Sequence, residues 1–193
     1  MNSLNLRMIL ACDKQWGIGI DGGLLTHIPA DLAFFKEKTV GGLIIVGRKT
    51  ANSFPGGKAL PDRINAMLST TETAREGFVI VRNLGELCNL IESKSFDDKP
   101  LVFDDKRVYV VGGGEIYSLL LPYTNSIFVT KMDAVYDADT FFIDLDEDDD
   151  FALVSESESI TENGVTFRFC EYVRHRNNDA KNEKGMCQLD AVI

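Results

Sequence analysis

The chain has 193 residues, of which 45% are hydrophobic and 26% are charged, and its formal net charge is −10. This balance is typical of a folded globular protein and excludes disordered, collagen-like and fibrous chains. The acid excess argues against a nucleic-acid partner, and the sequence has neither the roughly 18-residue apolar run of a membrane helix nor the apolar core of a secretory signal. We therefore expect a cytoplasmic protein that binds neither nucleic acid nor a membrane.

The charged residues are unevenly distributed along the chain. Residues 131–163 contain twelve acids and one base, whereas residues 36–63 contain six bases and two acids. The basic stretch predicts a field that favours an anionic small ligand, and scattered solvated side chains are the alternative interpretation.

The cysteines carry little functional information. The four cysteines lie far apart without a CxxC pair, and the chain has two histidines. This pattern predicts thiols in a reducing compartment and no metal site.

In the first half of the chain, buried apolar runs alternate with helical patterns, which is typical of an α/β fold. A strand at 6–11 is followed by a loop at 13–27, whose glycines allow unusual backbone angles and mobility. Pro29 begins a helix that runs to about Thr39, with apolar residues at helical spacing. The remaining elements expected here are a strand at 42–46, a strand-to-helix turn at 47–54, strands at 64–68 and 78–81, and a helix at 84–92.

In the second half, residues 95–106 predict a surface insertion, and the acids at 144–150 predict a solvated loop because six like charges in seven residues cannot be packed. Asn163-Gly164 is a hairpin signal between the last two strands. We expect one domain over 1–176, with eight strands in a mostly parallel mixed sheet that is flanked by helices and ends in an antiparallel hairpin, and a flexible tail at 177–193. The elements expected here are strands at 108–111, 126–132, 153–160 and 165–173, and a helix at 115–121.

Three places along the chain carry residues suited to chemistry. Asp31 lies in the first helical turn beside the glycine loop, where a carboxylate can pair with an amidine-like heterocycle, although the helix dipole alone also favours an acid there. The GRKT segment at 47–50 follows a buried strand and offers backbone N–H groups and positive charge to a phosphate. The GGG turn at 112–114 either lets a phosphate approach the backbone or merely relieves crowding.

The order and spacing of five motifs resemble those of the dihydrofolate reductase family, over roughly residues 6–174. This resemblance implies the family's sheet order and its reaction, which is hydride transfer from NADPH to 7,8-dihydrofolate to give 5,6,7,8-tetrahydrofolate. It also implies that the loop at 13–26 is a lid over the nicotinamide and that water protonates N5 of the pterin. The motifs are WGIGIDGGLLTHIPADLAFFK, IIVGRKT, LPDRINAMLS, VYVVGGGEIYSLLLP and IFVTKMDAVYDADTFF.

By position, the resemblance implies roles for individual residues. Asp31 matches the carboxylate that grips the pterin, Thr130 supports it through a hydroxyl, and Arg63 matches the arginine that holds the substrate's glutamate tail. Thr26 stands where most members have a tryptophan that orders a water, so either Thr26 holds that water or the pterin site is altered. The other implied substrate residues are Ile9, Leu32, Phe35, Phe54, Leu60 and Val111. The implied NADPH residues are Ala11, Ile18, Gly47, Arg48, Lys49, Thr50, Ser69, Thr70, Arg82, Val111, Gly113, Gly114, Glu115 and Tyr117.

Two alternatives to this function stay open at the level of sequence. One is a related NADPH-dependent pyrimidinone reductase of riboflavin synthesis, and the other is a non-catalytic folate- or nucleotide-binding module. Asp31 together with Arg63 favours folate, whereas Glu115 weakens the expected phosphate field because some relatives have an arginine there. We expect a monomer, with a dimer as the alternative.

Overall fold

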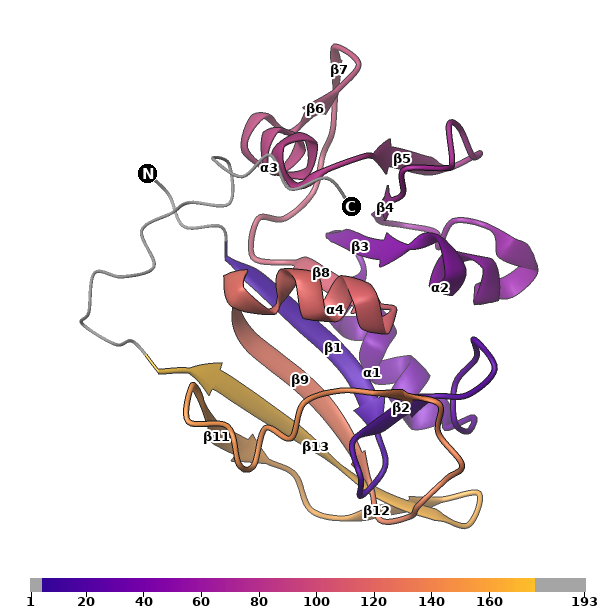
Figure 1. Cartoon of the computed structure of the whole chain (residues 1–193), viewed down its shortest axis with the longest axis vertical. Helices are drawn as coiled ribbons and strands as arrows, with labels where there is room; N and C mark the ends of the chain where they lie inside the picture. The colour runs from indigo at the N-terminus through magenta and orange to yellow at the C-terminus, as the bar shows by residue number, and fades with distance from the viewer. Residues whose placement is uncertain (1–4, 176–193) are drawn as a thin grey trace.

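One continuous sheet forms the centre of the protein, whose computed structural model describes residues 5–175 (Figure 1). The tail predicted at 177–193 lies outside the described residues. From one edge to the other, the sheet consists of β11 (Phe151–Glu156), β13 (Val165–Arg174), β9 (Thr124–Met132), β1 (Leu6–Cys12), β8 (Val108–Gly112), β3 (Leu43–Gly47), β4 (Ile64–Leu68) and β5 (Phe78–Val81).

The pairing directions agree with the predicted sheet. From β9 to β5 each strand is parallel to its neighbours in the sheet order, and β13 is antiparallel to both β9 and β11. This confirms a mostly parallel mixed sheet with an antiparallel C-terminal hairpin. A short strand, β12 (Ile160–Glu162), also pairs with β13 and adds a ninth strand to the eight predicted.

The single strand predicted at 153–160 is wrong, because the chain is interrupted between β11 and β12. At the interruption Ser157 donates its backbone N–H to the Phe169 carbonyl at 2.9 Å, and its hydroxyl accepts the Phe169 N–H at 3.0 Å. The serine side chain thus replaces a carbonyl of the ladder, a local alternative that this residue offers to the backbone. The turn after β12 is as predicted, since Asn163 and Gly164 have φ values of 52° and 79°, which a tight hairpin requires.

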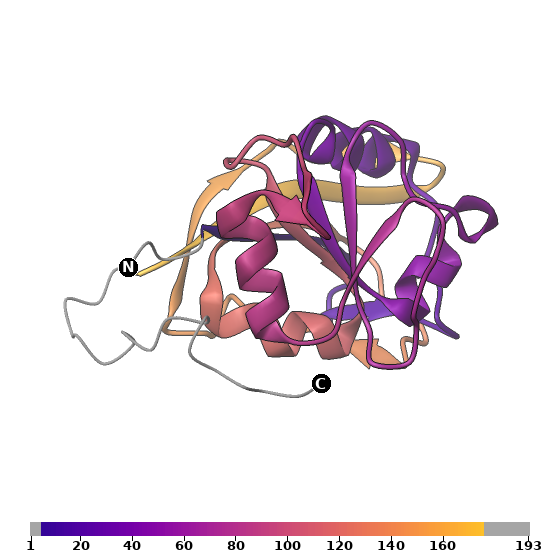
Figure 2. The same cartoon turned by 90° about the horizontal axis from the view of Figure 1, so that it is seen from above.

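Helices α1 (Pro29–Thr39), α2 (Arg48–Ser53), α3 (Leu84–Ser93) and α4 (Gly114–Leu120) cover the two faces of the sheet (Figure 2). Helices α1 and α2 pack on one face, and α3 and α4 pack on the other, over the largest apolar core. Because a strand buried on both faces needs apolar residues throughout, β3 reads Leu-Ile-Ile-Val-Gly and is entirely buried. The helices predicted at 29–39, 84–92 and 115–121 agree with α1, α3 and α4 to within one residue.

The glycine-rich segment at 13–27 is not a loop throughout. Its residues Gly17–Gly19 form β2, which pairs with β10 (Thr140–Phe141). Trp16, just before β2, is 5% exposed and has a φ of 60°. The expectation of a simple loop is therefore wrong for the first half of this segment, since a buried indole and a strand pair hold it.

The carboxylate of Asp13 fixes the base of this segment. It is 1% exposed, and its Oδ1 accepts the backbone N–H groups of Gln15 at 2.9 Å and Gly17 at 2.8 Å. Its Oδ2 accepts the N–H of Tyr136 at 2.9 Å, which ties β2 to the chain that follows β9. One buried acid thus satisfies backbone donors from two segments that are far apart in sequence.

The acidic segment at 144–150 is a loop, as predicted, but it is not simply solvated. Leu145 is 1% exposed and belongs to the core. Asp146 accepts a hydrogen bond from the Tyr172 hydroxyl at 2.5 Å and pairs with Lys131, whose ammonium lies over the Trp16 ring. Although partial burial acts in the opposite direction, these two hydrogen bonds lower the pKa of Asp146. The expectation of a fully solvated segment is wrong, because one apolar residue and two paired acids, Asp146 and Asp150, anchor the loop.

The segment predicted as a surface insertion at 95–106 contains a short hairpin. Its two strands are β6 (Ser95–Phe96) and β7 (Lys99–Pro100), which pair antiparallel. Phe103, after the hairpin, is 6% exposed and packs into the main core. The insertion is thus fastened to the fold at its carboxyl end.

We predict that Asp13→Ala lowers the free energy of unfolding by about 3 kcal/mol, because three backbone donors lose their buried acceptor. Urea unfolding monitored by Trp16 fluorescence measures this change. Asp137→Ala, at an exposed acid near the same segment, is the matched control and should stay within about 0.5 kcal/mol of the parent. Equal effects of the two substitutions would show that the Asp13 contacts do not stabilise the fold.

Candidate active site

Most of the candidate residues lie at the carboxyl edge of the parallel strands, whereas Leu60 and Arg63 precede β4 at its amino end. In sheets of this kind, ligands bind in the crevice outside the carboxyl ends, where the strand order reverses. Here the order reverses at β1. After β1 the chain passes through α1 to β3, on one side of β1, whereas β9 lies on the other side. The edge therefore brings together the start of α1, the end of β9 and the turns that lead into α2 and α4.

Asp31 and Thr130 are in direct contact at this edge. The Thr130 hydroxyl donates to Oδ1 of Asp31 at 2.6 Å, and Thr130 is 1% exposed. Burial raises the pKa of Asp31, and the hydrogen bond from Thr130 opposes that shift in part. Within residues 5–175 the Asp31 carboxylate accepts no further side-chain hydrogen bond, so its second oxygen is available to a ligand.

A small pocket opens beside Asp31. Four residues predicted from the family resemblance, Ala11, Ile18, Thr26 and Asp31, line it together. Thr26 is only half-buried, although the family's residue at this position is a large aromatic side chain. Four further residues line the pocket and were not predicted: Leu24, Leu25, Ile28 and Met132. The first three are apolar positions close to Thr26 in sequence. Met132 follows Thr130 by two residues in β9, so the strand alternation puts both side chains on the same face.

A separate apolar cluster packs beneath α1, to which Phe34 and Phe35 contribute. It is built on Ile9, Ile44 and Tyr109, which are at most 5% exposed. Five of the predicted substrate residues belong to this cluster: Ile9, Phe35, Phe54, Leu60 and Val111. The charged residues Asp31 and Arg63 and the apolar residue Leu32 do not. Leu32 is 40% exposed, since it lies on the solvent side of the first helical turn.

Arg63 lies at the opposite end of α1 from Asp31. Its Nε donates to the Pro61 carbonyl and its Nη1 to the Thr39 hydroxyl, both within hydrogen-bond distance, and its guanidinium lies 5.9 Å from the centre of the Phe35 ring. Burial lowers the pKa of Arg63, and the charge of Asp62 partly restores it. Arg63 does not line the Asp31 pocket, and its guanidinium meets the apolar cluster at Phe35.

Asn65 is a positioning residue that the sequence analysis missed. Its Oδ1 accepts the Leu60 N–H at 2.9 Å, and its Nδ2 donates to the carbonyls of Leu60 at 2.8 Å and Arg63 at 3.0 Å. The side chain is 2% exposed. It closes the loop before β4 and thereby fixes both Leu60 and Arg63. The sequence feature that could have identified Asn65 is an amide within an otherwise apolar strand.

Two strand-to-helix turns face each other across the same edge. Gly47 precedes α2 and Gly113 precedes α4, and neither helix start has a side-chain cap. A Cβ on Gly47 would lie 2.8 Å from the Ile116 side chain, and one on Gly113 would lie 2.8 Å from the Thr50 hydroxyl. Glycine is therefore required for close packing here, which supports the steric explanation, while the uncapped N–H groups also suit a phosphate.

The charged residues at these turns are exposed. Lys49 and Glu115 form an ion pair at 3.5 Å that joins the two turns. Arg48 is exposed and has no hydrogen bond or ion pair with the part of the chain that the structure describes. Of the positive charge predicted at 47–50, Glu115 therefore offsets the part on Lys49, and the part on Arg48 is unopposed.

The remaining predicted cofactor residues lie at the neighbouring strand ends. Ser69 is 6% exposed, and its hydroxyl accepts the N–H groups of Thr71 and Glu72, so it shapes the turn that presents the exposed Thr70. Its own N–H donates to the Val81 carbonyl, which places Arg82 beside this turn.

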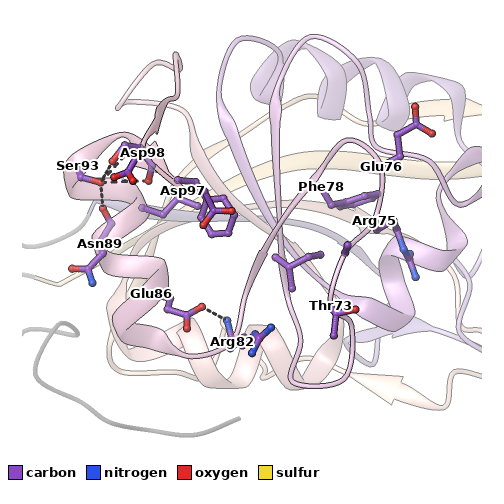
Figure 3. A pocket seen from close by; sticks show the side chains of 15 residues that line it. Thr73, Arg75, Glu76, Phe78, Arg82, Glu86, Asn89, Ser93, Asp97 and Asp98 are labelled. Carbon is purple, nitrogen blue, oxygen red and sulfur yellow. Dashed lines mark hydrogen bonds between the residues drawn. The ribbon is translucent and has the colours of Figure 1, made fainter.

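Arg82 also borders a wide, open hollow along β5, which is separate from the Asp31 pocket. Figure 3 shows this hollow between α3, with Glu86 and Asn89, and the turn that carries Thr73 and Glu76. No other predicted site residue lines it, and its acids outnumber its arginines. The hollow therefore does not replace the Asp31 pocket as the candidate site.

Tyr117 lies beneath the site and not on its surface. It is 5% exposed, and its hydroxyl donates to the Ile9 carbonyl at 2.7 Å. Burial, with a smaller contribution from the Asp31 charge, raises the pKa of Tyr117 above its ordinary range. The phenol therefore stays neutral and fixes the backbone of β1 next to the pocket.

Two further observations concern metals and membranes. Among residues 5–175, no three His, Cys, Asp or Glu side chains are grouped so that they could hold a metal ion. The same residues include no helix with the length and apolarity needed to cross a bilayer.

Comparison with known proteins identifies the relatives of this chain. The family model for dihydrofolate reductase matches residues 5–174. The dihydrofolate reductase of Schistosoma mansoni is 32% identical over 184 residues, covering 88% of this chain and 96% of the relative, and that of Bacillus subtilis is 29% identical over 178 residues, covering 91% and 98%. The structure of Enterococcus faecalis dihydrofolate reductase complexed with NADP(H) and RAB-propyl superimposes with a TM-score of 0.73 at 27% identity, covering 92% of this chain and 98% of that one.

We predict that Asp31→Asn raises the free energy of unfolding at neutral pH. Because the folded-state pKa of Asp31 is raised, its ionisation destabilises the fold above that pKa, and the penalty disappears as the pH falls toward the unfolded pKa. The variant removes the charge and keeps an oxygen that can accept the Thr130 hydroxyl. Urea unfolding at a series of pH values should show an advantage for the variant that is largest at neutral pH and shrinks in acid; an advantage independent of pH would contradict this account.

Proposed function

This chain belongs to the dihydrofolate reductase family, and we propose that its Asp31 pocket binds the pterin ring of the substrate while the turns before α2 and α4 bind the cofactor. It is an NADPH-dependent enzyme that reduces 7,8-dihydrofolate to 5,6,7,8-tetrahydrofolate. The two alternatives, a pyrimidinone reductase and a non-catalytic binding module, are not favoured by these relatives. The roles of individual residues are the content of the proposal.

The hydrogen-bonded pair of Asp31 and Thr130 at the start of α1, with Arg63 at the other end of this helix, carries this proposal. Asp31 and Thr39 are eight residues apart on α1, which corresponds to about 12 Å along the helix axis. Thr39 accepts a hydrogen bond from Arg63, so a carboxylate and a guanidinium stand at the two ends of the helix. A substrate with a cationic or amidine-like ring at one end, an apolar middle and a carboxylate at the other end matches this order of groups.

Asp31 recognises the pterin by charge-assisted hydrogen bonds. One oxygen is held by Thr130, and the carboxylate faces the 2-amino group and ring N3 of the substrate. The predicted apolar residues Ile9, Phe35, Phe54, Leu60 and Val111 surround the pterin and the aminobenzoyl group. In this environment an ionised Asp31 favours the protonated pterin, because opposite charges interact strongly where water is excluded.

Arg63 holds the glutamate tail. Its Nε and one N–H of Nη1 are engaged with Pro61 and Thr39, which orients the guanidinium and leaves the remaining N–H groups for a carboxylate. Lysine would be a poor substitute, because it lacks the planar fork that binds a carboxylate with two parallel hydrogen bonds.

The residues around the two turns fit a phosphorylated dinucleotide. Gly47 and Gly113 let the two turns pack closely against Ile116 and Thr50. Both helix starts present unpaired N–H groups, and Arg48 is an unopposed cation for a 2′-phosphate. Backbone groups of Ala11 and Ile18 in the Asp31 pocket orient the nicotinamide. NADPH, when bound, supplies the hydride that reduces C6 of dihydrofolate.

The protein contributes position and field to the reaction. The pocket holds the pterin against the nicotinamide site and excludes water from C6, and Thr26 keeps a water near the pterin for protonation at N5. The segment at 13–26, fixed at its base by Asp13, covers the nicotinamide side. No side chain is required as a proton donor to N5.

The cellular setting belongs to the same proposal. The protein acts in the cytoplasm as a monomer, and small molecules are its partners. Two buried cysteines, Cys12 and Cys170, are free thiols, which supports a reducing compartment. Size-exclusion chromatography with light scattering tests the monomeric state.

We predict that the parent enzyme consumes NADPH when dihydrofolate is added and that Asp31→Asn lowers kcat by about 100-fold or more at neutral pH. Without the carboxylate the pterin is less readily protonated, so part of the lost rate should return in acid. The loss of NADPH absorbance measures turnover, and Asp149→Asn at an exposed acid is the control. A neutral-pH rate equal to that of the parent would remove Asp31 from the mechanism.

Arg48→Ala should narrow the preference for NADPH over NADH by about tenfold or more, since a 2′-phosphate needs a cation and a free hydroxyl does not. The ratio of kcat/KM for the two cofactors measures this preference. Lys58→Ala removes another exposed base from the same positive region and should leave the ratio unchanged. If both variants keep the parental ratio, Arg48 does not contact the 2′-phosphate.

A further inference from the structure

The first turn of α1, which carries Asp31, is capped by a residue from a distant hairpin. The N-cap residue of α1 is Ile28, whose side chain cannot accept a hydrogen bond, and Pro29 has no N–H. Ala30 donates its N–H to Oε2 of Glu162 at 2.9 Å. Glu162 therefore does for this helix what a serine or aspartate at the N-cap does for others.

The hairpin fixes Glu162 in place. Glu162 is the last residue of β12, pairs with Val165, and directly precedes the tight Asn163-Gly164 turn. Val165 and Phe167 of β13 share an apolar cluster with Ile28 and Ala30, so the hairpin packs against the start of α1. The position of the carboxylate is thus set by the backbone of β12 and not by a flexible loop.

The interaction of Glu162 with the helix is not explained by pairing with a base. Within the described residues Glu162 forms no ion pair and is half-buried. Its observed partner is a backbone N–H at the positive end of a helix, where an acid is stabilised. An ordinary hairpin turn does not need an acid at this position.

The contact bears directly on Asp31. Ala30 is its immediate neighbour, and the first helical hydrogen bond closes around both, from the Leu32 N–H to the Ile28 carbonyl at 3.1 Å. Two neighbouring parts of the sheet therefore hold the same turn: Thr130 of β9 through the Asp31 side chain, and Glu162 of β12 through the backbone. Without the Glu162 contact, the remaining side-chain hydrogen bond to this turn is made by the side chain that must also bind the substrate.

We propose that Glu162 is a positioning residue for dihydrofolate binding, which acts by accepting the Ala30 N–H and so fixing the Asp31 carboxylate relative to Thr130. This inference rests on the proposed role of Asp31. It assigns a function to the β12–β13 hairpin, which contributes no residue to the pocket itself. It also implies that NADPH binding is independent of Glu162, because the cofactor turns lie at α2 and α4.

Dissociation constants of dihydrofolate and NADPH, measured separately by fluorescence titration of the full chain, test the proposal. Glu162→Ala should weaken dihydrofolate binding by about fivefold, the effect expected for a lost helix cap, and leave NADPH binding unchanged. Glu162→Gln should restore binding to near the parental value, because the amide oxygen accepts the same N–H. Glu158→Ala, at an exposed acid of the same hairpin segment, is the matched control and should change neither constant.

Three results would overturn the inference: unchanged dihydrofolate binding in Glu162→Ala, equal weakening of both ligands, or a Glu162→Gln variant as weak as the alanine variant. A double-mutant cycle separates this inference from the proposed function. If Glu162 acts through Asp31, the effect of Glu162→Ala disappears in an Asp31→Asn background. If Asp31→Asn alone binds dihydrofolate as tightly as the parent, the proposed role of Asp31 fails, whereas a persistent effect of Glu162→Ala in that background rejects the inference alone.

Discussion

A carboxylate held in an apolar pocket is the constraint on which the rest of this structure depends. Burial raises the pKa of Asp31, so the fold is less stable than it would be with a neutral residue at that position. The hydrogen bond from Thr130 offsets only part of this penalty. Such a group persists where its partner is a ligand, and the surrounding apolar cluster and the remote Arg63 define what that ligand must look like.

The sheet supplies the geometry that makes the arrangement possible. Because β1, β8, β3, β4 and β5 are parallel, their carboxyl ends deliver both the Asp31 pocket and the cofactor turns to one edge, although these segments are far apart in sequence. The antiparallel strands β13 and β12 extend the sheet past β9 and reach the start of α1 through Glu162. Acids elsewhere in the chain have a related task, since Asp13 and Asp146 anchor the segments next to the site.

Two departures from the family pattern find different explanations. Thr26 lines the pocket with a hydroxyl-bearing side chain, where the family resemblance predicts a tryptophan. Glu115 pairs with Lys49 across the two cofactor turns, which lowers the positive charge near the phosphates and leaves Arg48 as the unopposed cation. The first change alters the shape of the substrate side, and the second alters the charge of the cofactor side.

The sequence by itself determined most of the elements and named the candidate site residues. Apolar periodicity placed the strands at 64–68 and 78–81 at their observed bounds, Pro29 placed the start of α1, and the order of five motifs selected Asp31, Thr130 and Arg63. Apolar periodicity and turn residues are local features, because they depend on short stretches of chain, and the motifs can be compared along the chain without knowing its fold. The break at Ser157, the anchoring of Leu145 and Asp146, the exposure of Leu32 and the contact of Glu162 with Ala30 were decided only by the tertiary structure. Each depends on which distant segment supplies a hydrogen-bond partner or an apolar neighbour, and that information arises only when the chain is folded.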